Sequence, residues 1–197
     1  MAKRIAVISY DLDPNSPPTV DAVVVRDTLI TAGYQATLVH QWRLNETNPA
    51  TFFSAADWLR AFDGIVICDF YQFWNLREVI LSKLPVICLN PGYADDLGLA
   101  EKQVTYTAET ACKVVHLHPI TTGLAIGTHN LGNAVYVHSV SVQDHSVNVL
   151  ATTVANNPTL IAHKTHKLVF FGWFRMSSAS NGSALFKLLN QAAHWAF

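Results

Sequence analysis

Three aspartates stand where two short apolar segments end. Asp11 and Asp13 follow the segment Arg4–Ser9, and Asp69 closes the segment Ile65–Asp69. If these segments are neighbouring parallel strands, their carboxyl ends face one crevice, and three carboxylates there could hold Mg²⁺. The same residues also suit a shaped loop and a helix cap, which are the commoner roles of isolated acidic side chains. No glycine-rich phosphate loop follows the first segment, so neither a nucleotide nor a flavin is expected.

Nine histidines include two pairs with the spacing of transition-metal ligands. His116 and His118 share one face of an extended segment, and His163 and His166 could meet across a turn. Neither pair joins a cluster of Cys or Glu with a recognisable metal-site pattern. Surface exposure or core packing is the commoner role of a histidine, and His118 before Pro119 also suits a turn. We therefore expect no cofactor, with magnesium at the aspartates as the alternative.

Aromatic residues gather after two apolar segments. One group directly follows Asp69, and the other follows Leu168–Phe171. This density favours a contact surface for a protein, or a platform on which a sugar ring stacks, with Arg77 and Arg175 as polar anchors. Burial under neighbouring loops is the simpler role of such side chains. The candidate interface residues are Phe70, Tyr71, Phe73, Trp74, Trp173 and Phe174.

The elements that must position these side chains alternate along the first half of the chain. Short apolar runs predict strands, and longer segments bounded by capping residues predict helices. Thr19 is a suitable N-cap and Gly33 a suitable C-cap for the first helix. The predicted order is strand Arg4–Ser9, helix Val20–Ala32, strand Tyr34–His40, helix Ala50–Phe62, strand Ile65–Asp69, helix Gln72–Lys83 and strand Pro85–Leu89.

This alternation of strands and helices is typical of a doubly wound α/β sheet. We expect a flavodoxin-like, mostly parallel sheet with helices on both faces. The final strand, Leu168–Phe171, is continuously apolar, and a polar loop joins it to an amphipathic helix that starts near Ser183. No repeat or linker divides the chain, so we expect residues 1–197 to form a single α/β domain.

The middle of the chain departs from the α/β alternation. The segment Asn133–Ala151 alternates between apolar and polar residues, which predicts an additional β-hairpin with its turn near residues 143–145. Leu160–His163 predicts a short edge strand. Residues 93–112 fit neither the helical nor the strand pattern.

The composition is apolar and low in charge. Hydrophobic residues make up 50% and charged residues 14% of the 197 residues, the net charge is −1 and the pI is about 6.7. Because Lys and Arg do not cluster, nucleic-acid binding has no electrostatic support. No apolar run approaches the roughly 20 residues of a membrane span. The excess of apolar and aromatic residues therefore indicates core or a protein interface, including self-association.

Three cysteines, Cys68, Cys88 and Cys112, cannot all pair within one chain. Two of them lie in apolar, strand-like runs, as is typical of buried reduced thiols in the cytosol. The N-terminus is Met-Ala-Lys-Arg followed directly by an apolar strand, which is not the pattern of a signal peptide. We expect a cytoplasmic protein or a subunit of a particle assembled in the cytoplasm.

A family resemblance rests on short motifs spread along the chain. They are His118-Pro119-Ile120-Thr121-Thr122-Gly123-Leu124 with the alternating segment after it, Asp63-Gly64-Ile65-Val66-Ile67, Lys167-Leu168-Val169-Phe170-Phe171-Gly172, and Ala184-Leu185-Phe186 with Trp195. In these motifs the chain resembles the class I glutamine amidotransferase-like superfamily, in particular its ThuA-like members. The likeness covers nearly the whole chain in order, and its motifs are mostly structural.

The resemblance implies a nucleophilic cysteine on a tight elbow after a strand, with a His and a Glu after a later strand. Cys88 lies where such an elbow would be, but Val86–Asn90 has none of the glycines that expose a nucleophile. The segment where the His is expected reads Gly172-Trp173-Phe174-Arg175, and His194 lies far along the last helix. A thiol without a base is a weak nucleophile, and a free cysteine is commonly a small core residue. Cys88 and His118 stay weak catalytic candidates, and we expect no amidotransferase mechanism.

We therefore expect a non-catalytic amidotransferase-like domain that acts as a binding or structural subunit. It would dock to itself or to another protein through its aromatic loops and its hairpin. One alternative is a ThuA-like hydrolase or sugar-modifying enzyme that uses the three aspartates or His118. Another is a module that binds a small carbohydrate or a peptide without assembly. Converging Asp and His side chains would favour the enzyme, whereas a site filled with aromatic side chains would favour binding.

Overall fold

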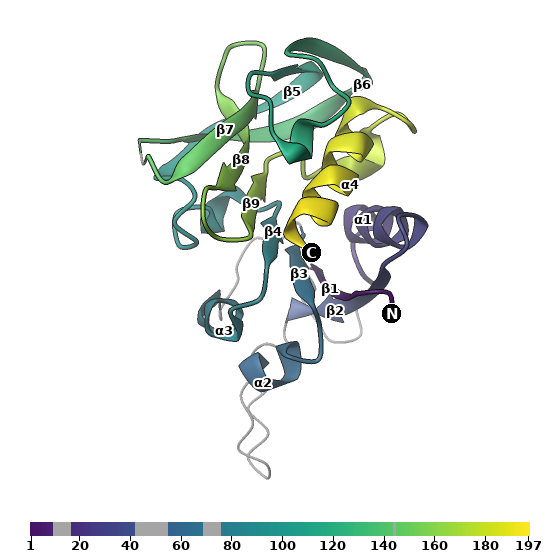
Figure 1. The fold of residues 1–197 in the computed structure, drawn as a ribbon. Helices are drawn as coiled ribbons and strands as arrows, with labels where there is room; N and C mark the ends of the chain where they lie inside the picture. The colour runs from purple at the N-terminus through teal and green to yellow at the C-terminus, as the bar shows by residue number, and fades with distance from the viewer. Residues whose placement is uncertain (10–16, 42–54, 69–75, 144) are drawn as a thin grey trace.

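A computed structural model describes residues 1–9, 17–41, 55–68, 76–143 and 145–197 (Figure 1). These residues form one mixed sheet of nine strands in the order β2-β1-β3-β4-β9-β8-β7-β5-β6. The neighbouring strands β2, β1, β3, β4 and β9 pair in parallel. The neighbouring strands β9, β8, β7, β5 and β6 pair antiparallel. The predicted flavodoxin-like α/β fold is confirmed, and its first four strands have the order 2-1-3-4.

Each half of the sheet is contributed by a different part of the chain. The parallel half consists of β1 (Arg4–Ser9), β2 (Gln35–His40), β3 (Gly64–Ile67), β4 (Val86–Cys88) and β9 (Leu168–Phe171). The antiparallel half consists of β5 (Lys102–Val114), β6 (Gly127–Ser141), β7 (Val147–Thr152) and β8 (Pro158–His163). The α-helices of the described residues are α1 (Val20–Thr31), α2 (Ala55–Leu59), α3 (Leu76–Ser82) and α4 (Ala184–Ala196), and the 3₁₀ turns are η2 (Pro91–Tyr93), η3 (Pro119–Thr121) and η4 (Met176–Ser178). Within the described ranges, no helix is both long and apolar enough to cross a membrane.

Helices cover both faces of the parallel half (Figure 1). On one face, α1 and α4 pack against a core cluster that includes Ile5 and Val7 of β1. On the other face, Leu59 of α2 belongs to a second cluster, with Ala6 of β1. Because successive residues of β1 enter different clusters, the strand is buried on both sides, as its continuous apolar run predicts.

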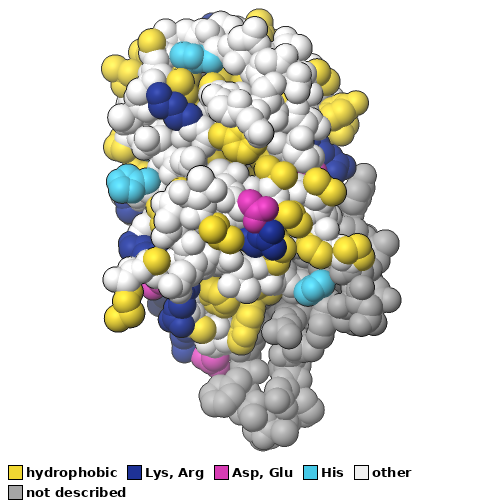
Figure 2. All heavy atoms as spheres, turned by 90° about the vertical axis from the view of Figure 1, so that its right-hand side faces the viewer, with side chains coloured by type: hydrophobic (Ala, Val, Ile, Leu, Met, Phe, Trp, Pro, Cys, Tyr) yellow, Lys and Arg dark blue, Asp and Glu magenta, His cyan; other side chains and the backbone are white. Residues whose placement is uncertain are grey.

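The face formed by α1 and α4 keeps apolar side chains at the surface (Figure 2). α1 buries Val25 and Leu29, yet it exposes Val20 and Ile30. Figure 2 shows an acidic and a basic side chain together at the centre of this face, with hydrophobic side chains around them. Part of the apolar surface of α1 therefore faces solvent.

Capping residues set the bounds of α1 as predicted. Thr19 accepts a hydrogen bond at its Oγ1 from the Ala22 N–H, at 3.2 Å. Gly33 follows the helix with a φ of +94°, a left-handed conformation that glycine adopts without steric strain. The start of α1 fixes Asp21 in the first helical turn, which matters for the site described below.

The predicted β-hairpin within residues 133–151 is wrong. β6 pairs with β5, from Lys102 opposite Ser141 to Val114 opposite Gly127. β7 pairs with β8 and with the end of β5, so β5 separates the two strands of the expected hairpin. Alternation identifies the faces of a strand but not its neighbour, and the true partner of β6 lies mostly in residues that fitted neither pattern. β8 is not the predicted edge strand, since it lies between β7 and β9.

Gly172, directly after β9, joins the end of the parallel half to two strands of the antiparallel half by backbone hydrogen bonds. The Gly172 N–H donates to the Thr159 carbonyl oxygen at 2.7 Å, and the Gly172 carbonyl accepts from the His138 N–H at 2.9 Å. A Cβ at this position would overlap the His138 carbonyl oxygen and lie 3.0 Å from the Thr159 carbonyl oxygen. A residue without a side chain therefore lets β6 and β8 approach the end of β9 this closely.

We expect Gly172→Ala to lower the free energy of unfolding by about 1–3 kcal/mol, because backbone carbonyls must move to admit the methyl group. Urea denaturation followed by circular dichroism measures this loss. Gly92→Ala is the matched control, since its Cβ would meet only the Asn90 Oδ1, at 3.2 Å. We expect the control to change stability by no more than about 0.5 kcal/mol. Equal stabilities of the two variants would contradict the close approach at Gly172.

Candidate functional site

The carboxyl ends of the parallel strands form one edge of the sheet, where open α/β sheets usually bind ligands. Ser9 ends β1, Cys88 ends β4, and Gly172–Arg175 follow β9. Several predicted site residues fall in segments 10–16 and 69–75, outside the described residues. They are Asp11, Asp13, Asp69, Phe70, Tyr71, Phe73 and Trp74. The magnesium site and the aromatic loop therefore stay predictions.

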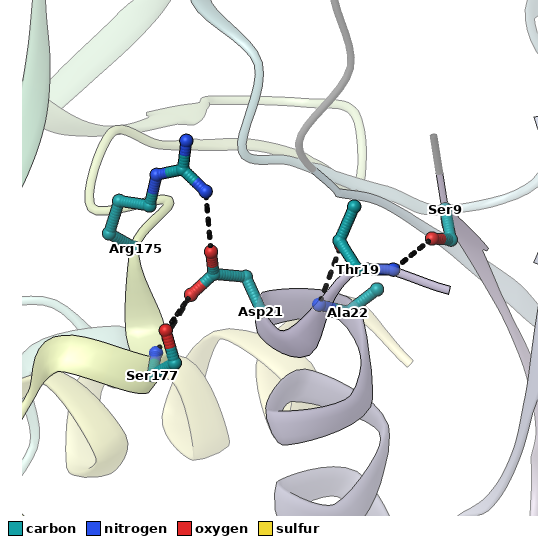
Figure 3. Close-up of polar contacts among 6 residues, drawn as sticks. All are labelled: Ser9, Thr19, Asp21, Ala22, Arg175 and Ser177. Carbon is teal, nitrogen blue, oxygen red and sulfur yellow. Dashed lines mark hydrogen bonds and ion pairs between the residues drawn. The ribbon is translucent and has the colours of Figure 1, made fainter. Parts of the chain in front are cut away.

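The carboxylate of Asp21, in the first turn of α1, is a centre of polar contacts at this edge (Figure 3). Its Oδ2 accepts from Arg175 Nη1 at 3.0 Å, and its Oδ1 accepts from the Ser177 N–H at 2.8 Å and the Ser177 hydroxyl at 2.6 Å. The Asp21 side chain is 4% exposed, whereas that of Arg175 is 40% exposed. A carboxylate in the first turn also interacts favourably with the helix dipole. Asp21 thus joins the start of α1 to the segment after β9.

The start of α1 is also tied to the end of β1 (Figure 3). The Thr19 N–H donates to the Ser9 hydroxyl at 3.2 Å. With donors on both of its oxygens, Asp21 serves as an acceptor that positions Arg175 and Ser177. We therefore do not assign it the role of a general base.

We expect Asp21→Ala to lower the free energy of unfolding by about 2 kcal/mol, because the Ser177 N–H and the Arg175 guanidinium lose a buried acceptor. Urea denaturation at pH 7 measures the loss. Asp27→Ala is the control on the same helix, since Asp27 pairs with Arg26 at the exposed surface. An exposed pair of this kind contributes about 0.5 kcal/mol or less. A similar loss in both variants would contradict the joining role of Asp21.

Cys88 is completely buried at the end of β4. Its Sγ–H donates to the Asn90 carbonyl oxygen at 3.1 Å, and burial raises the pKa of the thiol to about 12. No histidine is hydrogen-bonded to Cys88 in the part of the chain that the structure describes. The chain continues into η2, where the Asn90 Oδ1 accepts from the Gly92 N–H at 2.9 Å. Because the thiolate is the nucleophile, this raised pKa disfavours the reactive form of the thiol at neutral pH.

His118 lies in the turn that its place before Pro119 predicts, where it is the N-cap of η3. Its Nδ1 accepts from the Ile120 N–H at 3.2 Å, and its own N–H donates to the Thr121 hydroxyl at 2.9 Å. Its ring lies 5.3 Å from that of Trp195, over which Lys167 lies at 4.0 Å. Burial, then nearby His116 and Lys167, lower its pKa. Since Lys167 precedes β9, His118 lies toward the amino ends of the strands, away from Cys88.

The other predicted histidine pair also has local partners. The rings of His163 and His166 lie 4.6 Å apart, and the Nδ1 of His163 accepts from the N–H groups of Thr165 and His166. Among the described residues, no group of three or more His, Cys, Asp or Glu side chains could hold a metal ion.

Trp173 and Phe174 are buried, so the prediction that they form an exposed interface is wrong. Trp173 is completely buried, with its ring 5.7 Å from that of Phe171, and Phe174 is 5% exposed. The reason is that the two backbone hydrogen bonds of Gly172, to β6 and β8, hold the following residues within the core that α1 and α4 cover.

An exposed aromatic group that the sequence analysis did not single out lies beside Phe174. Tyr106 on β5 lies opposite His138 on β6, and Tyr136 lies two residues before His138, on the same face. The Tyr106 ring is 5.2 Å from that of Tyr136 and 4.8 Å from that of His138, which is 4.6 Å from Phe174. Tyr106 is 50% exposed and Tyr136 is 45% exposed. We name Tyr106, Tyr136, His138, Phe174 and Arg175 the aromatic–arginine cluster.

The cluster contains one cation and one neutral histidine. The Arg175 guanidinium lies 5.0 Å from the centre of the Phe174 ring. Burial, followed by the charge of Arg175, lowers the pKa of His138 to about 4. His138 is therefore neutral at pH 7 and packs as an aromatic ring between Tyr106 and Phe174.

Comparison with known proteins supports the fold. The sequence matches no protein-family model and no curated protein sequence. A proposed GMP synthase component from Thermoplasma acidophilum has 13% identity and a TM-score of 0.59, over 99% of this chain and 96% of that one. A proposed ThuA-like protein from Bacteroides uniformis has 13% identity and a TM-score of 0.61, over 99% and 91%. The CTP synthase glutaminase domain from Trypanosoma brucei, with bound acivicin, has 11% identity and a TM-score of 0.63, over 98% and 94%.

At these identities the solved structures show the fold alone. The chain has the class I glutamine amidotransferase-like fold, and the resemblance noted in its sequence is confirmed at that level.

The sequence analysis missed Asp21, Ser177 and the exposed tyrosines. One local signal was present for Asp21, which follows the N-cap Thr19 by two positions. Its partners are 154 and 156 residues away, and no sequence pattern relates positions so distant. Tyr106 lies in the segment that fitted neither the helical nor the strand pattern.

Proposed function

We propose that this chain is a binding domain with the amidotransferase-like fold that does not hydrolyse glutamine. The observation that carries the proposal is the state of Cys88, a buried thiol with a pKa of about 12 and a backbone carbonyl as its partner. The absence of His and Glu from the segment Gly172–Arg175 agrees with this interpretation. The fold then supplies a scaffold, and function depends on the surfaces it presents.

The aromatic–arginine cluster is the surface that we propose for binding. Tyrosine and arginine are enriched in the central residues of protein interfaces, and a tyrosine ring buries a large area at a small entropic cost. The two half-exposed rings of Tyr106 and Tyr136 adjoin the carboxyl edge, next to Arg175. The partner we propose is a protein, including a second copy of this chain. A small carbohydrate that stacks on the exposed rings is the alternative ligand.

The enzyme alternative draws no support from His118. A ThuA-like hydrolase or sugar-modifying enzyme would use the aspartates after β1 and β3 together with a histidine. Those aspartates lie outside the described residues, and His118 caps η3 beside Trp195, toward the opposite ends of the strands. The neutral His138 lies nearer the carboxyl edge, but its ring is packed between Tyr106 and Phe174.

We expect the Cys88 thiol to react with neither glutamine nor a glutamine-site inhibitor in the folded protein. Incubation with acivicin, the molecule bound in the Trypanosoma brucei glutaminase domain, should add no mass to the intact chain by mass spectrometry. Ammonia release from glutamine should equal that of Cys88→Ala. As a control for the reagent conditions, iodoacetamide should label all three cysteines after unfolding in urea and few before it, because Cys68, Cys88 and Cys112 are buried. An acivicin adduct on Cys88, or ammonia release that needs Cys88, would overturn the proposal.

We expect the protein to associate through the aromatic–arginine cluster. Light scattering across a concentration series should give a mass that rises above the 21.7 kDa of one chain. The double variant Tyr106→Ser/Tyr136→Ser should stay at that mass, because it removes the exposed rings. Leu117→Ser/Ile126→Ser is the control, since it removes two side chains that are 66% and 59% exposed outside the cluster. A single-chain mass of the native protein at all concentrations would exclude self-association.

A further inference from the structure

A cavity of about 570 Å³ opens at the other edge of the parallel half, by the amino ends of β4 and β9. It lies between α3 and the segment that follows η2, which both pack on the same face of the sheet. Its walls include the buried side chains of Val79, Val86 and Leu97, together with Leu168. This volume is within the range of about 300–1,000 Å³ that is usual for small-molecule sites.

The rim of this cavity includes a lysine, Lys83, and one acidic residue, Asp96. Lys83 and Asp96 form no ion pair with any residue that the structure describes. Burial, followed by the charge of the neighbouring Asp95, raises the pKa of Asp96. The ammonium group of Lys83 is therefore not neutralised from within the described chain.

The backbone at Lys83 is in an unusual conformation for a lysine. Its φ is +57°, and the other non-glycine residue with a positive φ in the described chain is Asn156, a residue type that tolerates it. Lys83 directly follows α3, a position where glycine is the usual residue. A strained residue that a glycine could replace without strain indicates that the side chain has a role of its own.

We propose that this cavity binds a small organic anion with an apolar body. The apolar walls bury the body of the ligand, and Lys83 faces its carboxylate, sulfonate or phosphate group. Lys167 also lines the cavity, but its ammonium lies over the Trp195 ring of α4, at 4.0 Å, so Lys83 supplies the positive charge. This site is separate from the carboxyl edge and does not depend on the function proposed there.

A matched pair of fluorescent probes tests the proposal. 8-Anilinonaphthalene-1-sulfonate and N-phenyl-1-naphthylamine have the same apolar body, with and without a sulfonate. In fluorescence titrations we expect one saturable site for the sulfonate and at least tenfold weaker binding of the neutral probe. Lys83→Glu should weaken sulfonate binding at least tenfold and leave the neutral probe within twofold. Lys113→Glu, which makes the same change in net charge on β5, should leave both within twofold.

A second variant separates binding from a structural role of Lys83. Lys83→Gly removes the charge and relieves the left-handed backbone, so we expect it to melt at the same temperature as the native protein or higher, while sulfonate binding falls about fivefold. A lower melting temperature with unchanged sulfonate affinity would assign Lys83 a structural role and overturn the proposal. So would equal affinities for the two probes, equal losses in Lys83→Glu and Lys113→Glu, or the absence of saturable binding.

Discussion

The close approach of three strands at Gly172 is the constraint on which the rest of the structure depends. β9 is the last parallel strand, and its end must accept a hydrogen bond from β6 while it donates one to β8. The ladder between β8 and β9 makes the two halves of the sheet continuous, and Gly172 brings β6 to the same point. The small volume of glycine is needed here for a steric reason that local sequence patterns do not express.

Gly172 also determines which side chains lie at the carboxyl edge of the sheet. Beyond Gly172 the chain turns Trp173 into the core and brings Phe174 against His138, so that Arg175 reaches Asp21 at the start of α1. An amidotransferase-like fold is thereby combined with an edge that carries stacked rings and a guanidinium, beside a buried thiol. Under the function proposed above, this edge would bind a partner through the shape and polarity of these side chains.

The sequence predicted what local interactions control. Neighbouring residues determine the cap Thr19, the turn at His118-Pro119, the strands Arg4–Ser9 and Leu168–Phe171, and the two-faced burial of the parallel strands. Contacts between distant segments were not predictable in this way. Strand alternation in residues 133–151 did not show that β5 is the partner of β6, and apolarity at Trp173 did not distinguish an interface from a core. These outcomes depend on which segments meet, and a single sequence does not encode this in any short pattern.

The place of β9 in the sheet has a consequence for how the chain is made. β9 lies between β4 and β8, yet it is the last strand to leave the ribosome. Until it arrives, the edges of β4 and β8 have no partner strand between them, and Asp21 lacks both of its distant donors. Such non-local pairings delay cooperative folding, and unpaired strand edges are sites of aggregation. The sheet is therefore completed only after β9 has been synthesised, and the nascent chain is most prone to aggregation just before β9 emerges.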